Sequence, residues 1–229
     1  MDLASAWGLD RVVDYYKNGR NTPQKLYQSE RHFILPQLRE NISILDIGCA
    51  AGGFASTIQH VISNFEYTGL DVSDAMIKEA KKNHPQHQFH VIEEANFSPL
   101  KNKKFDLVIC LGILHLHTAW RDTAISAWKH TKGSFIFDLR EIPGPTIESM
   151  KESFFKMNFN GGNGIYESTI LPYILLNAND ALNFVFSNFA DQAEKIEQFG
   201  SVSSPRESSQ LPVSKVMMNT WSLTKRKSE

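Results

Sequence analysis

The stretch Leu45-Asp46-Ile47-Gly48-Cys49-Ala50-Ala51-Gly52-Gly53-Phe54-Ala55 decides how this chain folds. It joins an apolar run that starts at Ile42 to a helical pattern that ends near Ile62. Small residues between a strand and a helix allow a ligand to approach the backbone closely. Asp71 ends the next apolar run, where a carboxylate can accept hydrogen bonds from both hydroxyl groups of a ribose. The two features together predict a nucleoside-binding site, and a tight turn without a ligand is the alternative interpretation.

Short apolar runs alternate with helical patterns along the middle of the chain. Ser73 is a plausible N-cap for a helix that continues to about Asn83. Another helix is expected from Thr118 to His130. Strands separated by helices of this length indicate parallel βαβ units in a doubly wound sheet. The strands are expected at residues 42–47, 66–71, 89–92, 105–110 and 133–139.

The pattern changes on both sides of these units. Two helical segments, at about residues 3–17 and 23–39, come before the first strand. After the fifth strand, the sequence predicts a hairpin, a helix and two antiparallel edge strands joined by a Ser/Pro-rich loop. The expected ranges are 153–159 and 167–171 for the hairpin strands, 177–189 for the helix, and 193–202 and 215–224 for the last strands.

The composition is that of an ordinary globular protein, with 229 residues of which 41% are hydrophobic and 21% are charged. The formal net charge of −1 gives no general attraction for polyanions, so the sequence carries no clear nucleic-acid signal. The basic cluster Lys225-Arg226-Lys227 is interpreted as a solvated tail.

The two cysteines, Cys49 and Cys110, each lie at the end of an apolar run and are expected to be buried, reduced thiols. The N-terminal residues lack the basic and apolar pattern of a secretory signal. No apolar run is long enough to cross a membrane. We therefore expect a cytoplasmic protein without a membrane partner.

Five motifs occur in an order and spacing that resemble those of class I methyltransferases, which depend on S-adenosylmethionine (SAM). The resemblance extends from about Ile42 to Leu139 and more loosely to the end of the chain. It implies a doubly wound, mostly parallel, seven-stranded sheet with a reversed last strand, in a single α/β domain over residues 1–229. A helical cap at 1–40 and a hairpin insertion at 144–176 on the acceptor side would together form the acceptor pocket. The motifs are LDIGCAAG (45–52), GLDVS (69–73), EAN (94–96), FDLVI (105–109) and GILH (112–115).

The resemblance also implies which residues bind SAM and its product, S-adenosylhomocysteine (SAH). The glycine-rich turn would pass beneath the methionine and ribose parts, with Asp46 orienting the amino group and Asp71 binding the ribose hydroxyls. Val72 and Met76 would flank the adenine. The implied cofactor residues are Asp46, Gly48, Cys49, Ala50, Gly52, Asp71, Val72, Met76, Glu94, Ala95, Cys110, Leu111 and Gly112.

Two positions depart from the family's usual pattern. Glu94-Ala95 stands where the family usually has Asp-Ala beside the adenine amino group, which puts that contact in doubt. Ala50 replaces the family's third glycine, which is a mild change. Residues 110–112 follow the pattern and would line the pocket beside the reacting methyl group.

His115 and His117 follow the fourth strand, close to where the resemblance puts the methyl group. A histidine is readily poised as a base, so either could take a proton from the acceptor or contact it, and a structural loop histidine is the alternative. Asp138 and Arg140 end the fifth strand, at the edge where such sheets bind ligands, or form a structural pair. An arginine of the N-terminal segment could grip the methionine carboxylate. The candidates of that segment to close over the site are Tyr15, Tyr16, Arg20, Tyr27 and Arg31.

Motifs of several other methyltransferase types are missing from the sequence. The fourth strand ends in Cys-Leu-Gly-Ile, not in the Asn/Asp-Pro-Pro-aromatic motif of amino-directed nucleic-acid methylases, and no Pro-Cys pair occurs. No acid follows this strand where metal-dependent O-methyltransferases hold magnesium, and no cysteine or histidine cluster has zinc spacing. Elimination therefore favours metal-independent transfer to oxygen, or less strongly nitrogen, of a small-molecule or sugar-containing acceptor.

Three alternatives stay open at this point. A tRNA or protein methyltransferase would carry a concentrated basic face near the carboxyl edge of the sheet. A non-catalytic SAM-binding partner or regulator would lack polar groups on the acceptor side. A nicotinamide-binding domain is disfavoured by Asp46, because dehydrogenases usually carry apolar residues at the end of the first strand. We expect a monomer or a homodimer.

Overall fold

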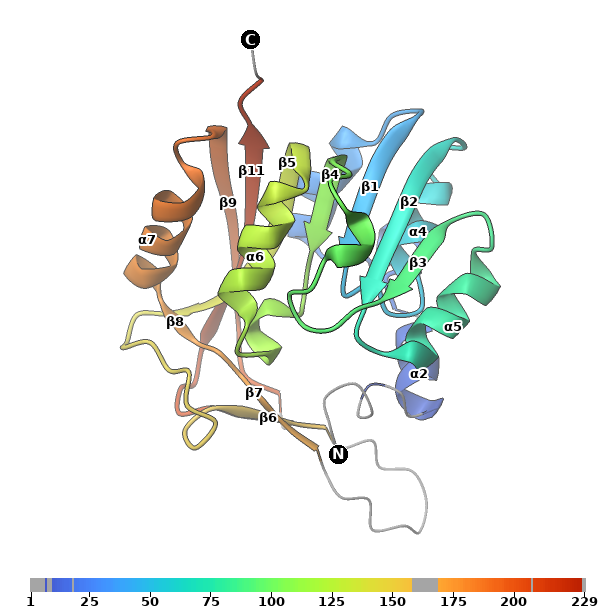
Figure 1. Ribbon diagram of the computed structural model, residues 1–229. Helices are drawn as coiled ribbons and strands as arrows, with labels where there is room; N and C mark the ends of the chain where they lie inside the picture. Colours follow the sequence, from blue (N-terminus) through green and yellow to red (C-terminus); the bar gives the residue numbers. More distant parts are fainter. Residues whose placement is uncertain (1–6, 8–9, 18, 158–168, 207, 228–229) are drawn as a thin grey trace.

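The computed structural model describes residue 7 and residues 10–17, 19–157, 169–206 and 208–227. At its centre is a sheet with the strand order β3-β2-β1-β4-β5-β11-β9 (Figure 1). A short eighth strand, β8 (Leu176–Asn177), pairs with the end of β5. All five strands predicted for the middle of the chain are confirmed. The seven strands are β1 (Ile42–Ile47), β2 (Phe65–Asp71), β3 (Gln88–Val91), β4 (Phe105–Cys110), β5 (Thr131–Ile142), β9 (Ala193–Ser203) and β11 (Val216–Lys225).

The strand directions match the predicted topology. Strands β3, β2, β1, β4 and β5 are parallel, whereas β11 is antiparallel to both of its neighbours. The chain reaches the sheet edge with β9 and then returns one place inward with β11, which lies between β5 and β9. The expected reversed last strand and the expected antiparallel pair at the edge are therefore both confirmed.

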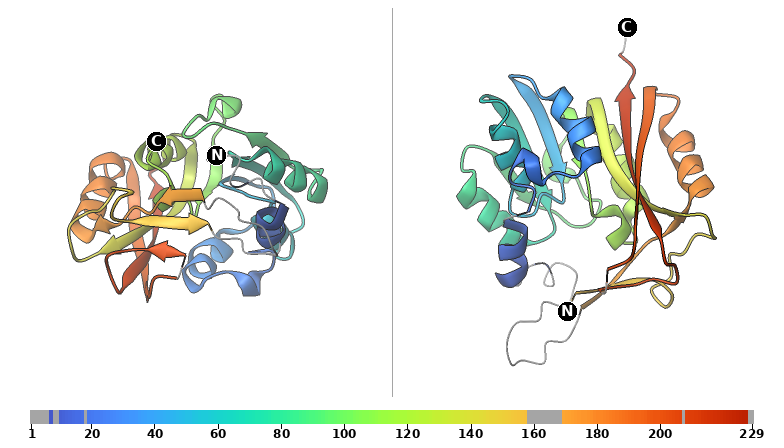
Figure 2. Two further views of the ribbon diagram at one scale, coloured as in Figure 1. Left: turned by 90° about the horizontal axis from the view of Figure 1, so that it is seen from below. Right: turned by 180° about the vertical axis from the view of Figure 1, so that it is seen from behind.

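Helices cover both faces of the sheet, as the nearly continuous burial of its strands requires (Figures 1 and 2). In β4 every residue except Asp106 is buried. The helices α6 (Trp120–Lys129) and α7 (Ala178–Phe189) pack on one face. The other face carries α3 (Gln28–Ile34), α4 (Gly53–Gln59) and α5 (Asp74–Asn83).

Local capping bonds fix where two of these helices begin. The Met76 N–H donates a hydrogen bond to Oγ of Ser73 at 3.3 Å, which confirms Ser73 as the N-cap of α5. In the same way the Asn179 N–H donates to Oδ1 of Asn177 at 2.9 Å and starts α7. Because α5 begins two residues after β2, its cap also fixes the backbone that follows Asp71.

The N-terminal segment differs from the two continuous helices predicted there. The helix α2 (Asp10–Lys17) lies within the first predicted range. The second range is divided into a 3-10 turn (Pro23–Lys25), α3 and another 3-10 turn (Leu35–Gln37). The division has a local cause, because the Tyr27 N–H donates to Oε2 of Glu30 at 2.9 Å and so starts a new helix.

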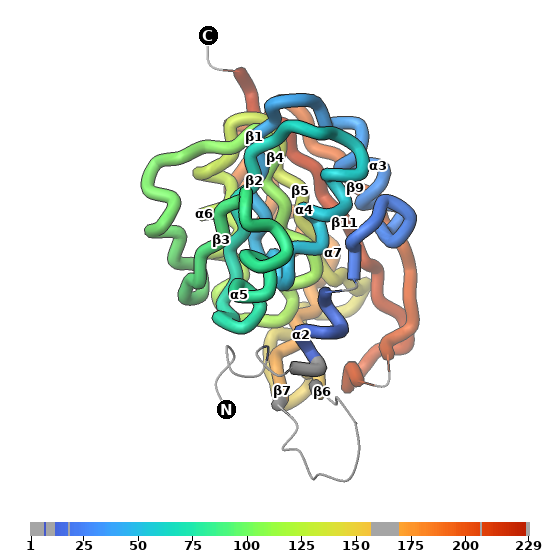
Figure 3. Tube along the Cα trace, turned by 90° about the vertical axis from the view of Figure 1, so that its right-hand side faces the viewer, coloured from blue at the N-terminus to red at the C-terminus, as the bar shows by residue number. Residues whose placement is uncertain are grey.

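A small three-stranded sheet lies beyond the carboxyl ends of the central strands (Figures 1 and 3). Its strands β6 (Phe154–Met157) and β7 (Thr169–Pro172) are antiparallel, which confirms the two strands of the predicted hairpin. Residues 158–168, which join the two strands, lie outside the described residues. The third strand, β10 (Ser209–Gln210), comes from the Ser/Pro-rich loop and was not predicted. Val12 of α2 packs with Leu171 of β7, so the N-terminal segment and the small sheet meet.

Candidate active site

A cavity of about 960 Å³ opens at the carboxyl edge of the central sheet. Its wall comes from the N-terminal segment, the turn after β1, the ends of β2 and β3, the loop after β4, the end of β5, the small sheet and the start of β11. Three of the predicted site residues, Asp46, Gly52 and Cys110, are not on this wall. The wall does bring together Gly48, Cys49, Ala50, Asp71, Val72, Met76, Glu94, Ala95, Leu111, Gly112, His115 and His117.

The turn after β1 presents its backbone to the cavity. Gly48 has φ of 75° and Ala50 has φ of 45°, both in the left-handed region. The N–H groups of Gly48 and Cys49 donate to the Leu70 carbonyl at 2.8 and 3.0 Å, which ties the turn to β2. A Cβ on Gly48 would lie 2.7 Å from Cγ2 of Ile113. Only glycine therefore fits between this turn and the loop after β4.

Gly52 lies behind the wall, where it shapes the turn. It is the N-cap of α4, with φ of 85°. A Cβ on Gly52 would lie 2.9 Å from Cδ2 of His84, the C-cap residue of α5. Nε2 of His84 is 3.0 Å from Oγ of Ser56 in α4, so the two helices meet closely at this point.

Asp71 lies on the wall at the end of β2 and holds two loops together. Its Oδ2 accepts the Ala50 N–H at 2.9 Å, and its Oδ1 accepts the Ser73 N–H at 2.9 Å. Burial raises the pKa of Asp71, and these backbone donors oppose the rise. Each carboxylate oxygen has a second lone pair, so the side chain can still accept the hydroxyl groups of a ribose.

Asp46 is buried beneath the turn, with 2% of its surface exposed. The hydroxyl group of Tyr67 donates a hydrogen bond to its Oδ2. Burial raises the pKa of Asp46 to about 7, although the Tyr67 hydrogen bond and the charge of Arg20 act in the opposite direction. Asp46 is therefore not on the open wall, and its contact with an amino group stays a prediction.

One end of the wall is suited to a flat, apolar group. Val72, Met76, Ile92 and Phe97 are all on the wall, and Glu94-Ala95 follows β3. Nδ1 of His117 is 3.9 Å from Oε2 of Glu94. Burial lowers the pKa of His117 to about 4, so this histidine is neutral near pH 7 and forms no ion pair with Glu94.

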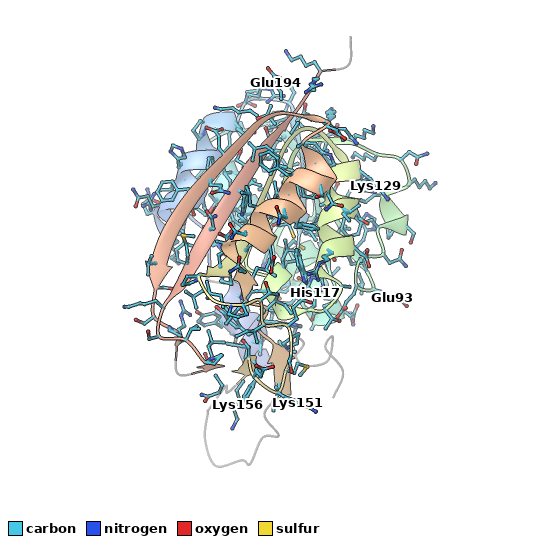
Figure 4. The ribbon with its side chains drawn as sticks, turned by 90° about the vertical axis from the view of Figure 1, so that its left-hand side faces the viewer. Glu93, His117, Lys129, Lys151, Lys156 and Glu194 are labelled. Atoms are coloured by element: carbon cyan, nitrogen blue, oxygen red, sulfur yellow. The ribbon has the colours of Figure 1, made fainter. Side chains whose placement is uncertain are left out.

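Figure 4 shows His117 between the level of Lys129, in the last turn of α6, and the level of Lys156, in β6 of the small sheet. This is the level at which the carboxyl ends of the central strands face the small sheet. His117 thus lies at the edge expected for it, although its side chain faces Glu94.

The two cysteines are buried, as expected, and differ in their surroundings. Cys49 is 4% exposed and its residue contributes to the wall, whereas Cys110 is fully buried in the core beneath α6. Alternate residues of a strand point to opposite faces, so Leu111 reaches the cavity and Cys110 does not. Gly112, with φ of 79°, continues the wall after Leu111.

Arg20 reaches across the cavity from the N-terminal segment. Its Nε and Nη2 both lie 2.8 Å from Oε1 of Glu30, which is 2% exposed. A Cβ on Gly112 would lie 3.5 Å from Nη2 of Arg20, so the guanidinium is next to the loop after β4. Arg31, the other predicted arginine, is not on the wall and donates to the Leu26 carbonyl at 2.8 Å.

A second arginine, Arg140, lies on the wall at the end of β5. Its Nη1 donates to Oδ2 of Asp138 at 2.8 Å, and its side chain also hydrogen-bonds Tyr173. Oδ1 of Asp138 accepts the Gly112 N–H at 2.7 Å. The rings of His115 and Tyr173 are in edge contact, with centroids 4.7 Å apart.

His115 is buried, and its Nδ1 has no hydrogen-bond partner within the described part of the chain. Burial, followed by the charges of Arg140, His117 and Arg20, lowers the pKa of His115 well below its usual value. The imidazole is therefore neutral, and one polar atom of it is available to a ligand in the cavity.

Arg206 is a wall residue that the sequence did not point to. It comes from the loop before β11, and its guanidinium hydrogen-bonds the side chains of Tyr15 and Tyr27. These two tyrosines and Tyr16 were predicted to close over the site, and all three lie on the wall. Burial raises the pKa of Tyr16 to about 12, so its phenol stays protonated. The pairing of Arg206 joins segments far apart in sequence, which no local pattern reveals.

The described residues contain no group of three or more His, Cys, Asp or Glu side chains arranged to hold a metal ion. No helix among them combines the length and apolar character needed to span a membrane.

Comparison with protein families identifies the segment that forms the turn. Residues 45–133 match the family model described as a methyltransferase domain. The match covers the chain from β1 to the start of β5, which includes the end of β2 and the loop after β4. The N-terminal segment, the small sheet and the strands β9 and β11 lie outside it.

Two curated relatives match parts of the chain. The uncharacterized protein MJ1252 of Methanocaldococcus jannaschii is 30% identical over 143 residues, which are 57% of this chain and 52% of that protein. Malonyl-[acyl-carrier protein] O-methyltransferase 1 of Ilyobacter polytropus is 28% identical over 129 residues, 52% of this chain and 46% of that protein. The chain thus spans about half the length of these relatives.

A solved structure shares the fold over nearly the whole chain. The plantazolicin methyltransferase BamL, in complex with SAH and a desmethyl substrate analogue, aligns with a TM-score of 0.57. The alignment covers 97% of this chain and 94% of that one at 14% identity. At this identity the likeness concerns the fold alone.

Proposed function

We propose that this chain, whose residues 45–133 match the model of a methyltransferase domain, is a class I SAM-dependent methyltransferase. It would transfer the methyl group of SAM to an oxygen atom of a small-molecule or sugar-containing acceptor, without a metal ion. The observation that carries this proposal is a single cavity whose wall holds both the cofactor motif and a separate polar and aromatic end. In this proposal residues 1–229 act as one domain, and residues 1–40 and 144–176 shape the acceptor end.

The residues present fit the cofactor. Asp71 has spare lone pairs for the ribose hydroxyls, and Val72 and Met76 supply an apolar place for the adenine. The backbone of the turn at Gly48 is exposed to the cavity, because a glycine has no side chain that would cover it. Arg20, held by Glu30, would grip the methionine carboxylate as a two-pronged donor.

Methyl transfer from SAM requires mainly that the protein align the acceptor with the methyl group. SAM supplies a methyl group on a sulfonium, which is already a strong electrophile. The loop at Leu111-Gly112 and the end of β5 would hold the acceptor in line with the bond that breaks. His115 would contact the acceptor through its unpartnered Nδ1 or take a proton from it, and His117 is the second candidate for these roles.

The size of the cavity supports a small acceptor. Its volume of about 960 Å³, which must hold both SAM and the acceptor, is at the upper end of the range of small-molecule sites, about 300–1,000 Å³. The N-terminal segment and the small sheet both contribute to the wall, so the acceptor end is surrounded on several sides. A cytoplasmic location and a monomeric or homodimeric state remain predictions from the sequence.

Calorimetric titration tests the cofactor. We expect micromolar binding of SAM and SAH, no binding of NAD, and a marked loss of affinity in Asp71→Ala. Binding of NAD without SAM would overturn the proposal. Turnover is then measured as SAH formation with pools of small hydroxylated metabolites, in the presence of a chelator. SAH formation only with tRNA or protein would point to those acceptors, and cofactor binding without turnover on any pool would point to a non-catalytic module.

A further inference from the structure

The acceptor end of the cavity is built around a buried arginine. Arg140 lies on the wall although it is only 7% exposed, and its neighbours there include Tyr173 and its strand partner Met218. A buried guanidinium has a high desolvation cost unless charged or polar partners surround it. Arg140 has one carboxylate partner, Asp138, and one phenol partner, Tyr173. A planar guanidinium donates five N–H bonds, so these two partners do not exhaust its capacity.

Asp138 fixes the place of this guanidinium. One oxygen of its carboxylate accepts the Gly112 N–H at 2.7 Å, and the other accepts Nη1 of Arg140 at 2.8 Å. The charged head of Arg140 is therefore tied to the loop that would lie beside the transferring methyl group. Donors fixed in this way need no rearrangement when a charged group arrives.

The charges around this end favour an anion. Arg140 and Arg20 both act on His115, and within the described residues Arg140 forms an ion pair with Asp138 and Arg20 with Glu30, while the charge of Asp138 also acts on Arg20. With SAM bound, the ammonium and carboxylate of its methionine part cancel, and the sulfonium adds one positive charge. A protonated amine would be repelled there, whereas an anionic oxygen would be attracted.

His115 is poorly suited to remove a proton from an uncharged acceptor. It is buried, and the charges beside it include two guanidinium groups, which hold its pKa well below the usual value. A base that cannot keep a proton at neutral pH assists an alcohol only weakly. A carboxylic acid needs no such help, because it is ionised above about pH 4.

We propose, resting on the methyltransferase function above, that the acceptor is a carboxylic acid whose carboxylate Arg140 holds beside the transferring methyl group, so that the product is a methyl ester. In the step, a carboxylate oxygen uses a lone pair to form the O–CH3 bond, and the electron pair of the breaking C–S bond stays on sulfur. The carboxylate and the sulfonium become a neutral ester and a neutral thioether, and no proton is released. Asp138 is a positioning residue in this scheme, and His115 offers a hydrogen bond.

Binding to the SAH complex tests the carboxylate directly. The probes are 3-phenylpropionate and its uncharged amide, 3-phenylpropionamide, because the acceptor end is lined by aromatic side chains. The wild-type complex should bind the carboxylate at least about tenfold more tightly than the amide, as expected for a charged hydrogen-bonded pair. In Arg140→Gln this preference should disappear, and Arg140→Lys should keep part of it.

Matched variants separate a lost contact from a lost fold. Asp138→Asn with Arg140→Gln removes the pair without leaving a buried charge unpartnered, and the Asn oxygen can still accept the Gly112 N–H. Arg121→Gln is the control, because Arg121 pairs with Glu148 away from the cavity. SAH affinity should change less than about threefold in all of these variants, and only the Arg140 variants should lose the preference for the carboxylate.

Turnover with a pool of carboxylic acids gives a second readout. The methyl group from SAM should appear in a product that alkali cleaves to methanol, and weakly buffered solution should show no proton release. The inference would be overturned if the carboxylate and the amide bind equally, or if neither probe binds up to about 10 mM. An unchanged preference in Arg140→Gln or an alkali-stable product would overturn it as well. The proposed methyltransferase function would survive all of these, since its own failure is the absence of SAM and SAH binding.

Discussion

The backbone N–H of Ala50 donates a hydrogen bond to the Asp71 carboxylate at 2.9 Å, and this bond joins the glycine-rich turn to the end of β2. The other oxygen of the same carboxylate accepts the Ser73 N–H, so one side chain organises two loops. Ser73 in turn caps α5. The residue that the family pattern assigns to the ribose is thus also a structural link, and its two roles can be measured separately.

Replacing Asp71 with asparagine should impair both roles. An amide offers one oxygen, so one of the two backbone N–H groups would lose its acceptor. We expect the free energy of unfolding to fall by about 1–3 kcal/mol, and the affinity for SAH to fall about 10- to 100-fold. Urea unfolding and calorimetry give the two numbers. Asp74→Asn is the control, since that exposed side chain pairs with Lys78 at the surface and its loss should change stability by less than about 1 kcal/mol. Equal effects of both variants would contradict the structural link.

Gly48 should tolerate no side chain. An added Cβ would lie 2.7 Å from Ile113, and φ of 75° strains any other residue. Gly48→Ala should lower the free energy of unfolding by about 2 kcal/mol or more and weaken SAH binding, because the turn must move. In Gly144→Ala the nearest atom, Cδ1 of Ile142, would be 4.0 Å away, so the effect should stay within about 0.5 kcal/mol. A wild-type melting temperature for Gly48→Ala would show that the turn can adapt.

The central fold could be predicted from the sequence because its signals are local. Continuous apolar runs such as 105–110 are typical of strands covered on both faces, and Ser73 caps its helix through a residue only three positions away. The pairing of β10 with β6 has no comparable signal. It joins two segments that are far apart in the sequence, Phe154–Phe155 and Ser209–Gln210. The division of the second N-terminal helix has a local cause in the hydrogen bond from the Tyr27 N–H to Glu30, and helical periodicity alone does not show it.

The site shows the same division between motif and tertiary contact. The motif residues near Gly48 and Gly112 lie on the wall because parallel strands end at one edge. The sequence did not show that Asp46 is bonded to Tyr67 beneath the turn, or that Cys110 points into the opposite core. Arg206, on the wall, hydrogen-bonds tyrosines of the N-terminal segment, and no spacing along the chain encodes such a contact.

Arg20 should discriminate between cofactor fragments. If it holds the methionine carboxylate, Arg20→Gln will weaken SAH binding at least about tenfold and leave the binding of adenosine, which has no carboxylate, nearly unchanged. Because the substitution leaves the buried Glu30 without its ion-pair partner Arg20, the double variant with Glu30→Gln is measured beside it. Arg39→Gln, at an exposed ion pair with Asp106, is the control. A parallel loss of adenosine and SAH affinity would assign Arg20 to the shape of the site and not to the carboxylate.

Asp46 and Asp106, on neighbouring strands, should make contributions to stability that change with pH in opposite directions. Burial raises the pKa of Asp46 to about 7 in the folded protein, against about 4 in the unfolded chain. The folded state therefore favours the protonated form, and the stability from this group is present at about pH 4 and lost as the pH rises to about 7. Asp46→Asn stays neutral and can still accept the Tyr67 hydroxyl. We expect this variant to match the wild type near pH 4 and to be more stable at pH 8, by about 1.4 kcal/mol for each unit of raised pKa.

The pKa of Asp106 is shifted in the opposite direction to that of Asp46. Burial alone would raise the pKa of Asp106, but hydrogen bonds from the Ser43 side chain and backbone and from Lys132 outweigh it, and the pKa is lowered. Its stabilisation is present above the unfolded pKa and is lost as the pH falls through the folded pKa. Asp106→Asn should therefore be less stable than the wild type at pH 7, and the difference should shrink in acid. Urea unfolding of the unliganded protein between pH 4 and pH 8 measures both variants. If both variants instead become less stable than the wild type as the pH rises, the carboxylate of Asp46 is ionised in the folded state and is held by Arg20 across the turn.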